Sequence, residues 1–187
     1  MNPQQAVEEA KRKFTGAIQH YHEQLKTVRT GRANAAMLDG VMVQAYGQPM
    51  PLNQVANVIA PEAQLLQITP FDPANLQAIS TAIRDNPNLG LNPSDDGRVV
   101  RLQIPPLTEE RRREMVKQLS GKQEDAMIAV RTIRHEVLDA LEQAKKDKEI
   151  GEDDAKRFGD QVEDAVQRTR GEIEAASKAK EAEIMKI

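Results

Sequence analysis

The prolines of this 187-residue chain are confined almost entirely to one stretch of the sequence. Nine of the ten lie between Pro49 and Pro106, and the other is Pro3. Because proline breaks helices, the flanking segments are free of the strongest obstacle to long helices. The flanks are also rich in charge: residues 32–106 hold 10 charged residues in 75, whereas the other 112 residues hold 45. This distribution predicts a helical domain with a second domain inserted into it.

The flanking segments carry apolar residues at spacings of three and four, which place them on one stripe of a helix. Three such stripes occur, over residues 7–28, 116–144 and 155–176. Three amphipathic helices of this kind form a bundle. We therefore expect an elongated antiparallel three-helix bundle.

The second helix has clear end signals. Thr108 can cap its start, and Glu109 and Glu110 suit the positive end of the helix dipole. We expect a single helix to about Ile150, which is about 60 Å at ~1.5 Å per residue. Gly151 then breaks it before the third helix begins.

The proline-rich middle contains short runs of β-forming residues instead. These runs cover residues 41–46, 55–59, 65–69 and 99–104, and glycines and prolines separate them. Residues 73–84 show helical spacing between two of the runs. The middle therefore predicts a small α/β domain, and the fold class of the whole chain is α+β.

Two crossings join the predicted domains, at residues 30–33 and 104–107. Gly31 adopts positive φ without steric cost, and Pro105 and Pro106 stiffen the return crossing, so all three are hinge candidates. The expected units are a bundle of residues 1–30 and 107–187 and an inserted domain of residues 31–106.

The composition excludes several classes of function. The chain has no Cys and three His, which removes thiolate nucleophiles and Cys-based metal sites and leaves little for a His-rich metal centre. It has no G-x-x-x-x-G-K-[ST] loop, no G-x-G-x-x-G and no H-E-x-x-H motif. We therefore expect no catalytic residues, no bound metal and no cofactor, and a protein that is not an enzyme.

Charge and hydropathy also limit the partners. The formal net charge is −3, so any basic surface must come from segregation of charges along the chain. No apolar run approaches the ~20 residues of a membrane span, and the first residues lack the basic and apolar regions of a signal peptide. We expect a cytoplasmic monomer that does not contact membranes.

Basic residues recur on one side of the second predicted helix, and acidic residues such as Glu142 are expected on other faces. The basic residues occupy two adjoining heptad positions, one with Lys117, Arg131 and Lys145 and the other with Arg113, Arg134 and Lys148. Such a row is either an ordinary charged face paired with neighbouring acids or a phosphate-binding surface. Aromatic residues for base stacking are absent from it, so the second alternative favours structured RNA recognised by backbone and shape.

A second basic spot is the segment Arg29-Thr-Gly-Arg32, where the first helix meets the crossing. An exposed arginine beside a glycine can clamp a phosphate or brace two domains, and the sequence leaves both roles open.

Six motifs, in order along the whole chain, resemble those of the bacterial ribosome recycling factor family. The motifs are Arg29-Thr-Gly-Arg-Ala33, Tyr46-Gly-Gln-Pro-Met-Pro-Leu52, Leu89-Gly-Leu-Asn-Pro93 with Asp96-Gly97, Ile104-Pro-Pro-Leu-Thr-Glu-Glu-Arg-Arg112, Ala129-Val-Arg-Thr-Ile-Arg134 and Lys146-Asp-Lys-Glu-Ile150. The resemblance implies an L-shaped, tRNA-like molecule in which a β/α/β sandwich is inserted into a three-helix bundle. It implies that the chain, with elongation factor G and GTP, splits the post-termination ribosome into subunits and releases mRNA and tRNA.

The resemblance also implies roles for particular residues. Arg131 and Arg134 match the pair by which the family's bundle contacts large-subunit ribosomal RNA, and Arg29 and Arg32 match a second RNA-facing pair. The chain departs from the family pattern at His135, where relatives often carry another basic residue, and at Gly151, where they often carry a Ser cap. A different class of function fits the residues alone: a helical scaffold or chaperone-like cofactor whose basic stripe binds an acidic protein.

Overall fold

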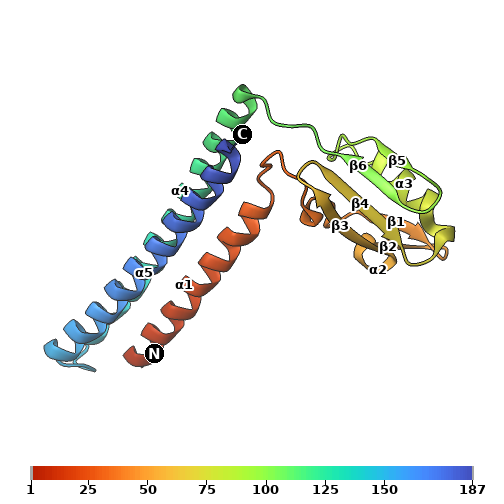
Figure 1. Ribbon diagram of the computed structural model, residues 1–187. Coiled ribbons are helices and arrows are strands. Elements are labelled where there is room, and N and C mark those ends of the chain that lie inside the picture. The colour runs from red at the N-terminus through yellow and green to blue at the C-terminus, as the bar shows by residue number, and fades with distance from the viewer. Residues whose placement is uncertain (1, 187) are drawn as a thin grey trace. The chain divides into compact units, whose positions relative to one another are not determined.

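The flanking segments form three long helices in the computed structural model, which describes residues 2–186 (Figure 1). They are α1 (Pro3–Lys26), α4 (Glu109–Lys146) and α5 (Glu152–Met185). The chain divides into a helical unit, up to Val28 and from Arg112 onward, and an α/β unit of residues 29–111. Within the described residues, no helix is long and apolar enough to cross a membrane.

The three helices pack through the apolar stripes that the sequence predicts. Of the first stripe, Val7, Phe14 and Tyr21 are among the buried residues, and Val130 and Ile173 are buried on α4 and α5. One residue of the second stripe is misplaced: Ala140 is exposed, and its neighbour Leu141 occupies the core. The bundle and the α+β class of the chain are confirmed.

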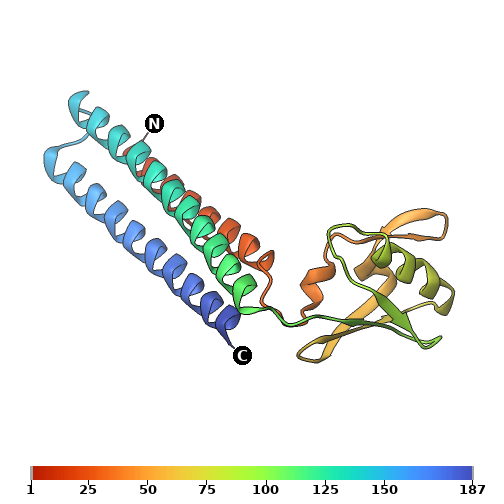
Figure 2. The same cartoon turned by 90° about the horizontal axis from the view of Figure 1, so that it is seen from above.

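A polar interaction links each pair of helices in the bundle. Lys13 Nζ on α1 lies 3.1 Å from Glu136 Oε2 on α4, and this hydrogen bond raises the pKa of Lys13. Arg134 on α4 is paired with Glu163 on α5. Figure 2 shows α4 and α5 side by side along their length.

The contact between α1 and α5 is of another kind, because it is buried. The Tyr21 hydroxyl and the Ser177 hydroxyl share a hydrogen bond in the bundle core. Burial raises the pKa of the Tyr21 phenol, because the charged form would lose its hydration in the core.

Helix α4 begins where the sequence predicts but ends earlier than predicted. Thr108 Oγ1 accepts a hydrogen bond from the Arg111 N–H, as expected of a cap. The helix was expected to reach about Ile150, but it ends at Lys146. The reason is a Schellman-type turn, in which Lys148 adopts a φ of 59° and the Glu149 N–H donates to the Ala144 carbonyl.

The α/β unit contains two antiparallel sheets. The first is a hairpin of β1 (Met42–Ala45) and β2 (Gln48–Pro51). The second has the strand order β3-β4-β6-β5, and its strands are β3 (Ala56–Glu62), β4 (Leu65–Pro70), β5 (Pro93–Asp95) and β6 (Val100–Gln103). Helix α3 (Leu76–Arg84) buries Ile79 and Ile83 in a core shared with both sheets.

The predicted strands correspond to β1, β3, β4 and β6, whereas β2 and β5 were not predicted. Both of these strands contain proline and neither contains a β-branched or aromatic residue, so their own residues do not mark them as strands. The short helices η1 (Ala35–Leu38) and α2 (Leu52–Val55) were also missed. The predicted helix over residues 73–84 begins as the 3₁₀ turn η2 (Pro73–Asn75) before α3.

The two crossings lie against each other in the α/β unit. Gly31 has a φ of 73°, and a Cβ placed on it would lie 3.1 Å from both the backbone nitrogen and the Cγ of Leu107. Gly31 is therefore required both for its backbone conformation and for this close approach.

Candidate nucleic-acid interface

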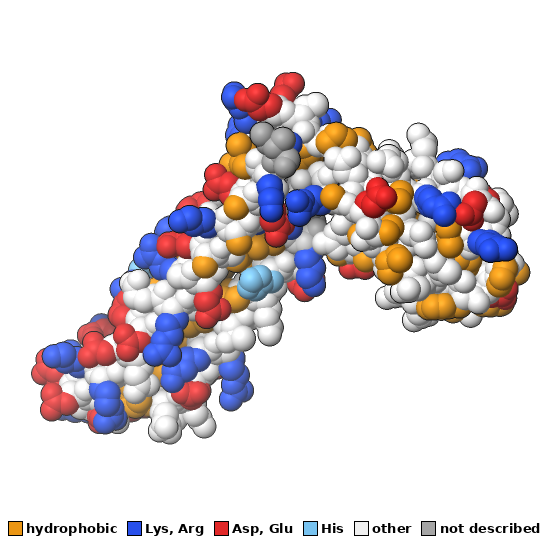
Figure 3. Space-filling model, in the orientation of Figure 1, with side chains coloured by type: hydrophobic (Ala, Val, Ile, Leu, Met, Phe, Trp, Pro, Cys, Tyr) orange, Lys and Arg blue, Asp and Glu red, His pale blue; other side chains and the backbone are white. Residues whose placement is uncertain are grey.

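The basic residues of α4 do not form one continuous row of free cations. Lys117 and Arg131 are exposed, whereas Lys145 is half-buried and its Nζ lies 3.9 Å from Glu142 Oε2. Glu142, expected on another face, is thus beside the basic row. Figure 3 likewise shows acidic and basic side chains interspersed on the visible face of the helical unit.

The predicted membership of the row needs a correction at its end. Lys148 follows the end of α4 and sits at the positive-φ position of the turn, so it does not share a helix face with the other basic residues. The five remaining residues lie on α4, namely Arg113, Lys117, Arg131, Arg134 and Lys145.

Arg131 and Arg134 lie at a groove of about 550 Å³ between α4 and α5. Its lining includes Met127 and Val130 from α4 and Val166 from α5. Charged and polar side chains from both helices complete it: Gln123, Glu124, Arg131, Arg134, His135, Glu163, Gln167, Arg170 and Glu174. The structure therefore brings the predicted arginine pair together with residues of a second helix.

The two arginines differ in how they are held. One oxygen of Glu163, Oε1, accepts from Arg134 Nε at 2.7 Å and lies 2.6 Å from Nη2. This hydrogen bond raises the pKa of Arg134, whose side chain is 34% exposed. Arg131 Nη2 is 3.8 Å from Glu124 Oε1, and its side chain is 61% exposed. Arg134 is thus fixed, whereas Arg131 is largely open to solvent.

The second basic spot divides in the same way. Arg29 Nη2 donates to the carbonyl of Asn88 at 2.9 Å and lies 3.4 Å from the carbonyl of Leu89, so it ties the first crossing to the loop after α3. Arg32 is exposed on the other side of Gly31. Arg29, Asn88 and Leu89 all belong to the α/β unit, so this contact is not the brace between two domains that the sequence left open.

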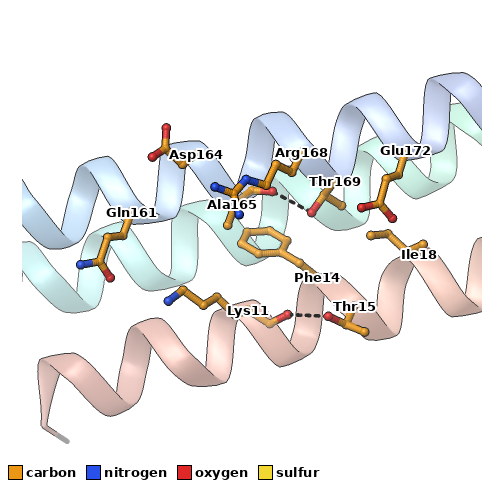
Figure 4. A pocket seen from close by; sticks show the side chains of 10 residues that line it. All are labelled: Lys11, Phe14, Thr15, Ile18, Gln161, Asp164, Ala165, Arg168, Thr169 and Glu172. Carbon is orange, nitrogen blue, oxygen red and sulfur yellow. Dashed lines mark hydrogen bonds between the residues drawn. The ribbon is translucent and has the colours of Figure 1, made fainter.

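A second groove of about 300 Å³ lies between α1 and α5 (Figure 4). Phe14 and Ile18 line it from α1, and Arg168 and Asp164 line it from α5. Arg168 therefore projects from α5 on the side of α1, away from the groove that holds Arg134. Among residues 2–186, no group of His, Asp or Glu side chains is arranged to hold a metal ion.

Comparison with known proteins identifies the family. The family model for the ribosome recycling factor matches residues 21–185. The chain belongs to the ribosome recycling factor family. This confirms the resemblance drawn from the six motifs, and ribosome recycling factors are translation factors rather than enzymes.

Similar proteins align over nearly the whole chain. The ribosome-recycling factor of Geobacillus kaustophilus is 43% identical over 98% of this chain and 98% of its own. That of Syntrophomonas wolfei is 46% identical over 91% of each chain. A solution structure of a ribosome recycling factor matches with a TM-score of 0.81 at 33% identity, covering 100% of this chain and 99% of that one.

A second structural match concerns a ribosome recycling factor on the ribosome. It belongs to a set of models for the T. thermophilus ribosome recycling factor and the E. coli elongation factor G bound to the E. coli post-termination complex. Its TM-score is 0.69 at 35% identity, and all of both chains is covered.

The α5 side of the arginine groove was not predicted from the sequence. Glu163 and Arg170 are seven residues apart, so they share a face of α5. The spacing alone does not tell which neighbouring helix that face adjoins. The missing information is the lateral position of α5 against α4, which only the packed bundle provides.

Proposed function

We propose that this chain binds the post-termination ribosome and, with elongation factor G and GTP, splits it into subunits, releasing mRNA and tRNA. The match of the family model over residues 21–185 carries this proposal. The models of a related factor with elongation factor G on the post-termination complex support it, because that factor aligns over the whole of this chain.

We propose that the bundle anchors the chain through phosphates of large-subunit ribosomal RNA. Arg131 would bind phosphate through a guanidinium group that is exposed to solvent, and Arg134 through one that Glu163 holds in place. Arginine suits phosphate because its N–H groups form paired, charge-assisted hydrogen bonds. Further proposed contacts on α4 are Arg113, Lys117 and Lys145, and those at the crossing are Arg29 and Arg32.

The α/β unit is proposed to be the moving part. It is joined to the bundle by two chain crossings, and Gly31 and the Pro105-Pro106 pair are the proposed pivot. The chain has no Gly-rich phosphate loop, so GTP hydrolysis is assigned to elongation factor G. The free energy that drives splitting then comes from elongation factor G.

The decisive experiment measures binding and splitting separately. The purified protein is sedimented with vacant 70S ribosomes, and splitting is then followed by light scattering after addition of elongation factor G and GTP. We expect co-sedimentation without the partner and splitting only with it. Binding that survives ribonuclease treatment of the target would indicate an acidic protein partner and contradict the proposal.

A further inference from the structure

The groove between α4 and α5 holds one arginine more than the predicted pair. Arg170, on α5, lines the groove together with Arg131 and Arg134 of α4. It is exposed, and it lies one helical turn beyond Val166 in the groove lining. Three guanidinium groups thus border one cavity from two helices.

The three arginines differ in the carboxylates near them. Glu163 lies within 2.7 Å of two nitrogens of Arg134, and Glu124 lies 3.8 Å from Arg131. For Arg170, no hydrogen bond, ion pair or ring contact is formed with any residue in the described range 2–186. All five of its N–H donors are therefore available to a ligand.

Arg134 also keeps donors for a ligand despite its ion pair. Glu163 Oε1 accepts from the Nε–H and lies 2.6 Å from Nη2, which leaves both N–H groups of Nη1 for a ligand. The carboxylate thereby holds the guanidinium in one orientation without consuming it. A held donor loses less conformational freedom when it binds.

The net charge of the groove explains why such donors matter. Its three arginines are balanced by three glutamates, Glu124, Glu163 and Glu174. A groove of this kind does not attract anions through a net positive field, so a ligand must instead form direct hydrogen bonds to guanidinium groups. Phosphate oxygens accept such paired bonds well.

We propose that Arg170 is the third arginine of this groove to bind phosphate, and that Arg170, Arg131 and Arg134 together bind one RNA backbone segment there. The inference rests on the proposed binding of ribosomal RNA by Arg131 and Arg134 and extends that surface from α4 to α5. RNA phosphate is the occupant because the groove is continuous with that surface.

The test compares two arginines of α5. Arg170→Gln removes the proposed contact, and Arg168→Gln is the matched control, because Arg168 lines the groove on the α1 side. Dissociation constants for 70S ribosomes are measured over a series of salt concentrations. We expect Arg170→Gln to weaken binding about tenfold and to reduce the salt slope by about 0.7 to 0.9, and Arg168→Gln to change neither. Melting followed by circular dichroism should be the same for both variants.

Equal affinities and slopes for wild type and Arg170→Gln would overturn the inference. If Arg131→Gln with Arg134→Gln still weakened binding, the proposed function would stand and the RNA contact would end at α4. If that double variant also bound like wild type, the proposed RNA surface itself would fail.

The nature of the occupant is tested from a neighbouring position. Gln167 also lines the groove, and a photo-crosslinking amino acid is placed there in the full chain bound to 70S ribosomes. We expect a crosslinked product that ribonuclease degrades. A product that only protease degrades, or the absence of any crosslink, would overturn the inference.

Discussion

The two units of this chain obtain their structures by different means. All five glycines with positive φ lie in the α/β unit, and within the described residues of the bundle no glycine has positive φ. The bundle depends instead on apolar side chains at regular spacing, such as Val7 and Phe14. A helix surface outside such a stripe tolerates substitution, because few contacts there hold the fold. The bundle can therefore carry a binding surface at little expense of stability, whereas the α/β unit depends on particular backbone conformations.

Deleting the α/β unit is expected to have the largest effect on activity. Residues 34–104 are replaced by a short flexible link, which closes a loop rather than cutting the bundle core. We expect the remaining bundle to fold and to bind ribosomes, but to lose splitting completely. Helicity, co-sedimentation and light scattering measure these three properties. Splitting at the wild-type rate would show that the α/β unit is not the moving part.

Removing the arginine pair of α4 should separate binding from stability. For Arg131→Gln with Arg134→Gln, we expect ribosome affinity to fall on the order of 100-fold and the salt slope to flatten by about one to two. The melting temperature should change little, because exposed ion pairs contribute about 0 to 1 kcal/mol. The control is Arg12→Gln with Arg168→Gln, two exposed bundle arginines outside the α4/α5 groove. Equal losses in both double variants would indicate non-specific attraction.

Gly31→Ala tests the conformational demand at the crossing. We expect it to destabilise the α/β unit by about 1 to 2 kcal/mol, through positive φ and the approach to Leu107. Gly40→Ala is the matched control, because Gly40 has a φ of 84° and open space around its Cβ position. Urea unfolding gives the free energy of unfolding of each variant. Because both positions have positive φ, the difference between the two values is due to the approach to Leu107. If the pivot proposal is right, Gly31→Ala also lowers splitting more than binding, and equal effects of the two variants on splitting would contradict it.

Lys148→Gly tests the positive φ at Lys148, which is an exception within the bundle. Lys148 holds a positive φ at the end of α4, where glycine is favoured. We expect the substitution to raise the free energy of unfolding by about 1 kcal/mol. Lys146→Gly, in the last turn of α4, should lower it by about 0.5 to 1 kcal/mol. Thermal unfolding of both variants measures these changes. If Lys148→Gly did not stabilise the protein, the turn would not limit its stability. Ribosome binding should be unchanged if Lys148 lies outside the binding surface.

The smallest effect concerns acid stability of the α/β unit. The Asp96 carboxylate accepts from the backbone N–H groups of Val99 and Arg98 and from Arg101, and these bonds lower its pKa to about 2. Because the pKa of the folded state lies below the ordinary value near 3.8, the stabilisation is complete above about pH 4 and is lost as the pH falls through 2. We expect the protection factor of the Val99 amide, its exchange rate relative to that of an unstructured chain at the same pH, to fall over that interval. Asp96→Asn should exchange faster at neutral pH and lose this pH dependence.

The bundle was more predictable from sequence than the α/β unit, for a physical reason. Helical periodicity is local, so Val7 to Val28 could be assigned before any contact was known, and Thr108 gave the start of α4. The end of α4 was missed because a lysine occupies the turn position that glycine usually marks. Strands β2 and β5 were missed because their partners, not their own residues, make them strands.

In the candidate site, too, the features that lie along one helix could be predicted from the sequence, and those that depend on packing between helices could not. The spacing of Arg131 and Arg134 along one helix predicted that they lie close together, and the structure places both at one groove. The contributions of Glu163 and Arg170 depend on how α5 lies against α4, which no local pattern contains.

The buried hydrogen bond between Tyr21 and Ser177 sets the alignment of α1 and α5. Apolar stripes of similar residues can slide past each other by one helical turn, about 5.4 Å, and still bury comparable surface. In this bundle such a slide would leave two hydroxyl groups without partners in the core, at about 1 to 3 kcal/mol each. The pair thus favours one register of α1 against α5, and with it the relative heights at which these two helices present their outer side chains.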